Sequence, residues 1–103
     1  MKIFLTGATG YIGGSVALGL IKDGHVVMGL VRSKEQATQV AAMNIEPIIG
    51  SLDNLDLLEQ FASSSDAIIN AADAEHKKSV YYMLNAIEGS QKVFIHTSGL
   101  KDF

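Results

Sequence analysis

Three glycines, spaced three residues apart near the amino terminus, indicate more about the fold of this chain than any other part of its sequence. They are Gly7, Gly10 and Gly13, and they directly follow an apolar run at residues 3–5. Glycines at this spacing, between an apolar run and a helical pattern, are typical of the tight strand-to-helix turn that opens a βαβ unit. We therefore expect a buried strand, a turn without bulky side chains, and a helix, in that order.

The rest of the chain continues this alternation of strands and helices. Short apolar, β-branched runs predict strands at residues 3–6, 26–31, 45–49, 67–71 and 93–97. Helical periodicity predicts helices over residues 11–23, from residue 33, from residue 53 or 54, and over residues 75–88. Right-handed crossovers then predict an α/β fold, a doubly wound parallel sheet of five strands in the order 3-2-1-4-5, forming one domain over residues 1–103.

Capping signals support the predicted helix ends. Ser33, with Gln36 three residues later, has the spacing of a capping box at the start of the second helix. Gly24 and Gly89 are placed to end the first and the fourth helix.

Composition narrows the class of protein. An apolar fraction of 48% in 103 residues suits one small domain with a buried core. A net charge of -3 without a basic run argues against a nucleic-acid partner. The chain has no cysteine, and its three histidines lack metal-site spacing, so we expect no disulfide and no metal. The uncharged stretch 3–21 contains five glycines, which favours a cytoplasmic protein without a membrane span.

The glycine turn has the chemistry of a phosphate-binding site. Free amides at a helix N-terminus, together with the helix dipole, favour an anion such as a pyrophosphate. Gly7 lets the chain turn sharply, Gly10 lets the backbone approach the phosphates, and Gly13 lets the helix pack closely on the sheet. We expect the ligand over the carboxyl ends of the first and fourth strands, where the strand order reverses. The alternative is a purely structural turn in an unrelated α/β fold.

Several motifs together resemble one family. The chain is similar to the extended or atypical short-chain dehydrogenases/reductases, the NAD-dependent epimerase/dehydratase-like proteins. The motifs that carry this resemblance are residues 6–13, 24–27, 31–33, 50–52, 66–72 and 96–99. The resemblance implies a truncated NAD(P)-binding Rossmann fold, since chains of that family are more than twice as long.

The resemblance also implies cofactor-binding residues at four places along the chain. These residues are Gly7, Ala8, Thr9, Gly10, Tyr11, Ile12 and Gly13 in the turn, Arg32 and Ser33 after the second strand, Ser51 and Leu52 after the third, and Asn70, Ala71 and Ala72 at the end of the fourth. Ser51 stands where the family usually has an acid. The small residues 70–72 also fit an ordinary buried strand.

Arg32 distinguishes between the two nicotinamide cofactors. An acidic residue at the end of the second strand would bond the adenosine ribose and repel a 2′-phosphate, whereas a guanidinium binds a phosphate in bidentate fashion. Arg32 therefore favours NADP over NAD. The alternative is a solvated arginine that stacks on adenine and favours neither.

The catalytic residues that the resemblance implies are missing. Family enzymes use a Tyr with a Lys four residues later, but none of Tyr11, Tyr81 and Tyr82 has that lysine. The family's strand-end hydroxyl falls on Gly99, and Ser98 lies one residue early. We therefore predict no catalytic residue in this chain.

Three functions remain open. The first is a cofactor-binding module without turnover of its own. The second is an NADP-dependent oxidoreductase or epimerase by ancestry, and the third is a non-catalytic redox-sensing or structural protein.

The last strand predicts association with a second copy. As the edge of the sheet, residues 92–97 would leave Val93, Phe94 and Ile95 unprotected. We expect a homodimer or higher assembly through this strand or through the fourth helix.

Overall fold

A computed structural model of the chain describes residues 1–72 and 76–96. Strands and helices alternate throughout this part of the chain. The elements are β1 (Lys2–Thr6), α1 (Tyr11–Lys22), β2 (Val26–Val31), α2 (Lys34–Ala41), β3 (Glu46–Ile49), α3 (Leu55–Ser64), β4 (Ala67–Asn70), α4 (Lys77–Ala86) and β5 (Val93–His96).

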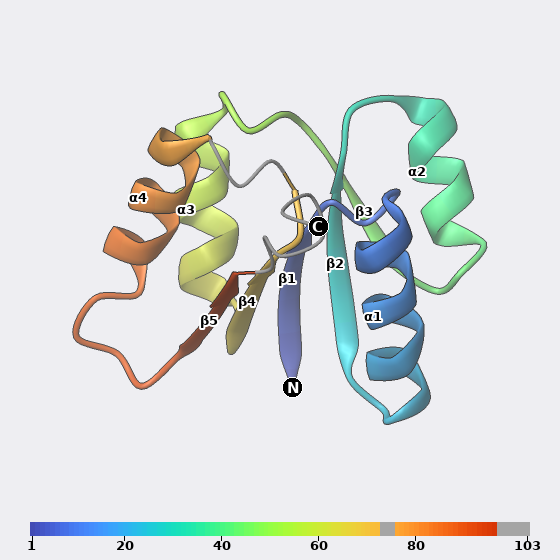
Figure 1. The fold of residues 1–103 in the computed structure, drawn as a ribbon, viewed down its shortest axis with the longest axis horizontal. Helices are drawn as coiled ribbons and strands as arrows, with labels where there is room; N and C mark the ends of the chain where they lie inside the picture. Colours follow the sequence, from blue (N-terminus) through green and yellow to red (C-terminus); the bar gives the residue numbers. More distant parts are fainter. Residues whose placement is uncertain (73–75, 97–103) are drawn as a thin grey trace, which may run out of the picture.

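The five strands form one parallel sheet in the order β3-β2-β1-β4-β5, which confirms the predicted topology. Ile3 of β1 is in register with Val27 of β2 on one side and with Ala67 of β4 on the other. The helices α1 and α2 cover one face of the sheet, and α3 and α4 cover the other (Figure 1). The strand order reverses between β1 and β4, so the loops after these two strands meet at one edge.

Two apolar clusters, one on each face of the sheet, form the core. Ile3 and Leu5 of β1 belong to the cluster beneath α1 and α2, whereas Phe4 between them belongs to the cluster beneath α3 and α4. This alternation follows from the two-residue period of a strand. Each large apolar side chain buried in this way contributes about 1.5–3 kcal/mol. Covered on both faces, the central strands hold the loops at their ends in fixed positions.

Several element boundaries differ from the sequence-based prediction. β3 begins at Glu46 rather than at residue 45, because the Ile45 amide donates to the Val40 carbonyl of α2 over 3.0 Å. β4 ends at Asn70 rather than at residue 71. α4 ends at Ala86 instead of residue 88. The predicted start of this helix at residue 75 and the predicted end of the last strand at residue 97 lie outside the described residues.

The capping signal at α2 is confirmed in part. The Ser33 hydroxyl accepts a hydrogen bond from the Gln36 amide over 3.2 Å, as a capping box requires. The Gln36 side-chain oxygen, however, accepts from the amide of Arg32 over 2.8 Å rather than from that of Ser33. The cap therefore extends one residue further back and ties the end of β2 to the first turn of α2.

The edge strand β5 leaves two, not three, of its apolar side chains unprotected. Val93 and Ile95 are 49% and 47% exposed, as expected for an unprotected edge. Phe94 is not unprotected, because it points to the opposite face and packs against the cluster beneath α3 and α4. No helix within the described ranges is long and apolar enough to cross a membrane.

Candidate functional site

The turn between β1 and α1 is built around Gly7 and Gly13. Gly7 has a φ of +80°, which disfavours any residue with a side chain. A Cβ on Gly7 would lie 2.5 Å from the Ala71 carbonyl carbon, and a Cβ on Gly13 would lie 1.9 Å from the Gly7 carbonyl oxygen. Both glycines are therefore required by close backbone packing inside the protein itself.

Gly10 differs from the other two glycines. It is the N-cap of α1 with an ordinary φ of −78°, so its backbone conformation suits any residue. A Cβ there would meet only the Gly7 carbonyl oxygen, at 3.3 Å, within 4 Å. That distance is tight for a contact with backbone, so the turn would have to shift by a few tenths of an ångström, and a larger side chain would also obstruct access to the first turn of α1. The site thus fits an anionic group that approaches the helix N-terminus.

A cleft of about 300 Å³ opens beside this turn, at the carboxyl ends of the strands. It is enclosed by the β1–α1 turn and by the loops after β2, β3 and β4. The residues that line it are Gly7, Thr9, Gly10, Leu30, Val31, Arg32, Gln36, Gly50, Ser51, Leu52, Ala71 and Ala72. Eight of the residues predicted from the sequence are thus brought together around one hollow: Gly7, Thr9, Gly10, Arg32, Ser51, Leu52, Ala71 and Ala72.

Four predicted residues lie elsewhere. Ala8 is buried in the core beneath α1, and Gly13 is buried behind the turn. Ser33 is exposed and its hydroxyl caps α2. Asn70 is fully buried in β4.

For two further predicted residues, Tyr11 and Ile12, only the backbone in the first turn of α1 is described.

Asn70 connects three strands inside the protein. The Thr6 hydroxyl of β1 donates to the Asn70 side-chain oxygen, and the Asn70 amide nitrogen lies 3.0 Å from His96 Nδ1 of β5. Thr6 and Asn70 are both fully buried, so these contacts satisfy polar groups that water cannot reach. The Asn70 side chain therefore joins the strands beneath the site.

Four residues that line the cleft were not among the predicted site residues: Leu30, Val31, Gln36 and Gly50. Gly50 belongs to a family-like motif, which could have identified it. Gln36 carried a capping signal, but its place in the cleft follows from its bond to the Arg32 amide. Val31 likewise belongs to a family-like motif, at residues 31–33, whereas Leu30 has only the pattern of an ordinary strand residue.

Arg32 is the one charged side chain among the described lining residues of the cleft. It is exposed, and within the described part of the chain its guanidinium has no hydrogen-bond or ion-pair partner. An unpartnered guanidinium beside a helix N-terminus gives this edge of the cleft a positive field. A larger hollow of about 570 Å³ lies near Tyr82, but Asp53 and Asp56 at its lining make it a poor place for a phosphate.

Four of the tyrosines and histidines, Tyr81, Tyr82, His25 and His96, make contacts that do not form a catalytic arrangement. Tyr81 is 65% exposed on α4 and contacts the Tyr82 ring edge to face. His25 Nδ1 lies 3.2 Å from the terminal amine of Met1, and His96 bonds Asn70. Ser98 and Gly99, the candidate positions for a strand-end hydroxyl, lie outside the described residues.

Comparison with protein families identifies the family to which the chain belongs. Residues 7–100 match the model of the NAD(P)H-binding family, and the chain belongs to this family. The match confirms the resemblance to a family of NAD(P)-binding proteins that the glycine turn and the later motifs carried.

Two similar proteins are considerably longer than this chain. An uncharacterized protein of Schizosaccharomyces pombe is 42% identical over 81 residues, which are 79% of this chain and 27% of that protein. The oxidase ucsJ of an Acremonium species is 39% identical over 106 residues, 95% of this chain and 30% of the oxidase. The chain thus spans less than a third of the length of these two relatives.

A solved structure shows the same fold. The NADPH-dependent quinone oxidoreductase QOR2 of Escherichia coli, in complex with NADPH, matches with a TM-score of 0.73 and 20% identity. The match covers 93% of this chain and 36% of that one. At this level of identity the likeness supports the fold and no more.

Proposed function

We propose that the cleft binds a nicotinamide dinucleotide, with the pyrophosphate at the β1–α1 turn and the adenosine between the ends of β2 and β3. The observation that carries this proposal is the cleft at the N-terminus of α1, where Gly10 has no side chain to obstruct a ligand and Arg32 lies in the same lining. Thr9 and Ser51 are the hydroxyl-bearing residues at the cleft lining that would bond the ligand.

NADP is the cofactor that we propose. The unpartnered guanidinium of Arg32 suits the 2′-phosphate that distinguishes NADP from NAD. The bond from the Arg32 amide to Gln36 supports this assignment, because it fixes the backbone that carries the guanidinium.

Cofactor binding without turnover is the activity that we propose for the 103 residues alone. No tyrosine among them has a lysine four residues later, the pair that family enzymes use for proton transfer. In a longer protein the cofactor would supply hydride chemistry, and an oxidoreductase activity fits the names of the Acremonium oxidase and the quinone oxidoreductase. A redox-sensing role would use the same binding without turnover.

A two-fold dimer through α4 is the assembly that we propose. Lys77, Tyr81 and Leu84 follow one another on α4 at spacings of four and three residues. Glu88 follows four residues later, just beyond the end of the helix, and all four residues are exposed. Antiparallel packing of two such helices would bury Tyr81 and Leu84 and place Lys77 of one copy near Glu88 of the other. The β5 edge offers a second route, through Val93 and Ile95. A cytoplasmic location stays a prediction.

Calorimetric titration with NADPH and NADH tests the proposed binding. We expect saturable binding of NADPH below millimolar concentration, and a loss of at least about ten-fold in affinity for Gly10→Val, whose side chain would obstruct the cleft. Gly19→Ala is the matched control, since a Cβ there meets nothing within 4 Å and lies in the same helix. Absence of binding of either cofactor at millimolar concentration would overturn the proposal.

A further inference from the structure

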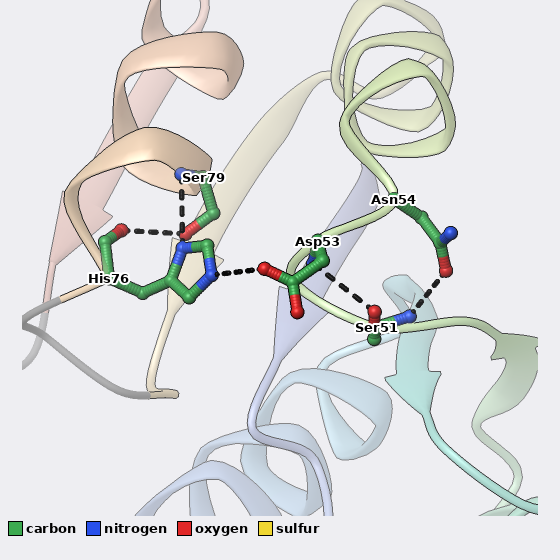
Figure 2. Close-up of polar contacts among 5 residues, drawn as sticks. All are labelled: Ser51, Asp53, Asn54, His76 and Ser79. Atoms are coloured by element: carbon green, nitrogen blue, oxygen red, sulfur yellow. Dashed lines mark hydrogen bonds and ion pairs between the residues drawn. The ribbon is translucent and has the colours of Figure 1, made fainter.

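A polar contact joins two of the loops that border the cleft. Asp53 lies between β3 and α3, two residues after Ser51, and His76 is the N-cap of α4, four residues after Ala72. Asp53 Oδ1 and His76 Nε2 are 3.0 Å apart (Figure 2). Ser51 lines the cleft, whereas Asp53 and His76 lie outside its lining, so the contact ties the loop that carries Ser51 to the start of α4.

The orientation of the His76 ring is fixed by α4. His76 Nδ1 accepts a hydrogen bond from the Ser79 amide over 3.2 Å, and the Ser79 hydroxyl donates to the His76 carbonyl over 2.8 Å. Because Nδ1 accepts, Nε2 carries the proton and donates to Asp53. Ser79 is fully buried, so this cap anchors the ring to the body of the helix.

Asp53 is held on its own side by the loop after β3. The Asp53 amide donates to the Ser51 hydroxyl over 3.2 Å, and the Ser51 amide donates to Asn54 Oδ1 over 2.8 Å (Figure 2). A continuous chain of hydrogen bonds therefore runs from α4 through His76 and Asp53 to a residue of the cleft. The Asp53 side chain is 88% exposed, so the contact with His76 is of modest strength.

We propose that Asp53 and His76 form a positioning latch, which holds the β3–α3 loop against the start of α4 and thereby sets the affinity of the cleft for its dinucleotide. Neither residue contacts the ligand. The latch acts by ordering Ser51 before the ligand arrives, because a loop that is already ordered loses less entropy on binding. This inference rests on the proposed function of the cleft.

His76→Asn separates the latch from the helix cap. Asparagine is a good N-cap residue and keeps a bond to the first turn of α4, but it is too short to reach Asp53. We expect NADPH affinity to fall about two- to five-fold, the effect of an exposed pair of modest strength. In the protein without ligand, amide exchange at Ser51 and Asp53 should become faster. His25→Asn is the matched control, since His25 lies away from the cleft, and it should change neither quantity.

Two substitutions of Asp53 separate the hydrogen bond from the charge. Both Asp53→Asn and Asp53→Ala remove the negative charge, but only asparagine keeps an oxygen that can accept from His76 Nε2. We expect Asp53→Asn to retain the NADPH affinity that Asp53→Ala loses. In a double-mutant cycle, Asp53→Ala should add nothing to His76→Asn.

The outcomes distinguish the latch from the function of the cleft. Unchanged NADPH affinity and unchanged exchange in His76→Asn would overturn the latch, as would additive effects in the double variant. If the unsubstituted protein bound no cofactor, the proposed function would fail. Amide exchange at Ser51 in the ligand-free variants would still decide whether the latch orders the loop.

Discussion

The carbonyl oxygen of Gly7 occupies the place that a side chain on Gly13 would need, only 1.9 Å from the position of its Cβ. Gly7 in turn lies against the backbone of Ala71, where its own Cβ would come within 2.5 Å. The turn, the first helix and the end of β4 are therefore packed backbone to backbone. This packing places the N-terminus of α1 directly beside the loop after β4.

Gly13→Ala should destabilise the protein by about 2 kcal/mol or more, because the new methyl group overpacks a rigid backbone contact. Gly19→Ala in the same helix should instead stabilise it by about 0.5–1 kcal/mol, since a Cβ there meets nothing within 4 Å. Urea denaturation monitored by circular dichroism measures both. Equal stability of the two variants would contradict the close approach of Gly7 and Gly13.

The buried pair of Thr6 and Asn70 predicts a second stability effect. Asn70→Leu leaves the Thr6 hydroxyl without its acceptor in a place that water does not reach, and should cost about 1–3 kcal/mol. Thr6→Val combined with Asn70→Leu should cost less than the sum of the two single changes, because the buried Thr6 hydroxyl is then no longer left unpaired. Additive losses in a double-mutant cycle would show that the pair is not coupled.

The sheet could be predicted from the sequence because the apolar patterns that identify strands and helices are local and periodic. Apolar runs and glycine stops predicted the order of strands and helices along the chain, and the glycine turn together with right-handed crossovers predicted the strand order. The direction of single side chains was less predictable. Phe94 packs inward between two exposed neighbours because the register of β5 against β4 decides its face. The sequence alone does not reveal this register, so it does not tell on which face of the sheet the Phe94 side chain lies.

The candidate site was predictable where backbone geometry defines it. It was less predictable where side chains form hydrogen bonds with residues far away in the chain. Glycine spacing identified Gly7 and Gly10, and the ends of the parallel strands brought Arg32 and Ser51 to the same cleft. The burial of Asn70 depends on contacts with Thr6 and His96, which are 64 and 26 residues away in the chain. No local sequence pattern indicates hydrogen bonds between residues so far apart in the chain.

Arg32→Asp tests the choice between the two cofactors. An acidic side chain at this place would repel the 2′-phosphate of NADP and could accept bonds from the ribose hydroxyls of NAD. We expect NADPH affinity to fall by at least about ten-fold while NADH affinity stays the same or rises. Lys34→Asp, on the exposed first turn of α2, is a charge-matched control. Tight NADPH binding that Arg32→Asp leaves unchanged would contradict the NADP assignment.

Leu84→Glu tests the proposed dimer. A charge in the middle of the exposed stripe on α4 should shift sedimentation toward the monomer, because it would be buried without a partner in the two-fold packing. Leu18→Glu on α1 is the matched control, since Leu18 is 53% exposed on another helix. A well-behaved monomer of the unsubstituted protein at micromolar concentration would rule out the dimer.

Amide chemical-shift mapping with NADPH is the decisive test of dinucleotide binding in the cleft, because it locates the ligand on the chain without assuming catalysis. We predict that the largest shifts fall on Gly7, Gly10, Arg32, Ser51 and Ala72, which line the cleft from its four loops. Shifts that concentrate instead on α4 and β5, with the β1–α1 turn unchanged, would contradict the assignment of the cleft as the dinucleotide site.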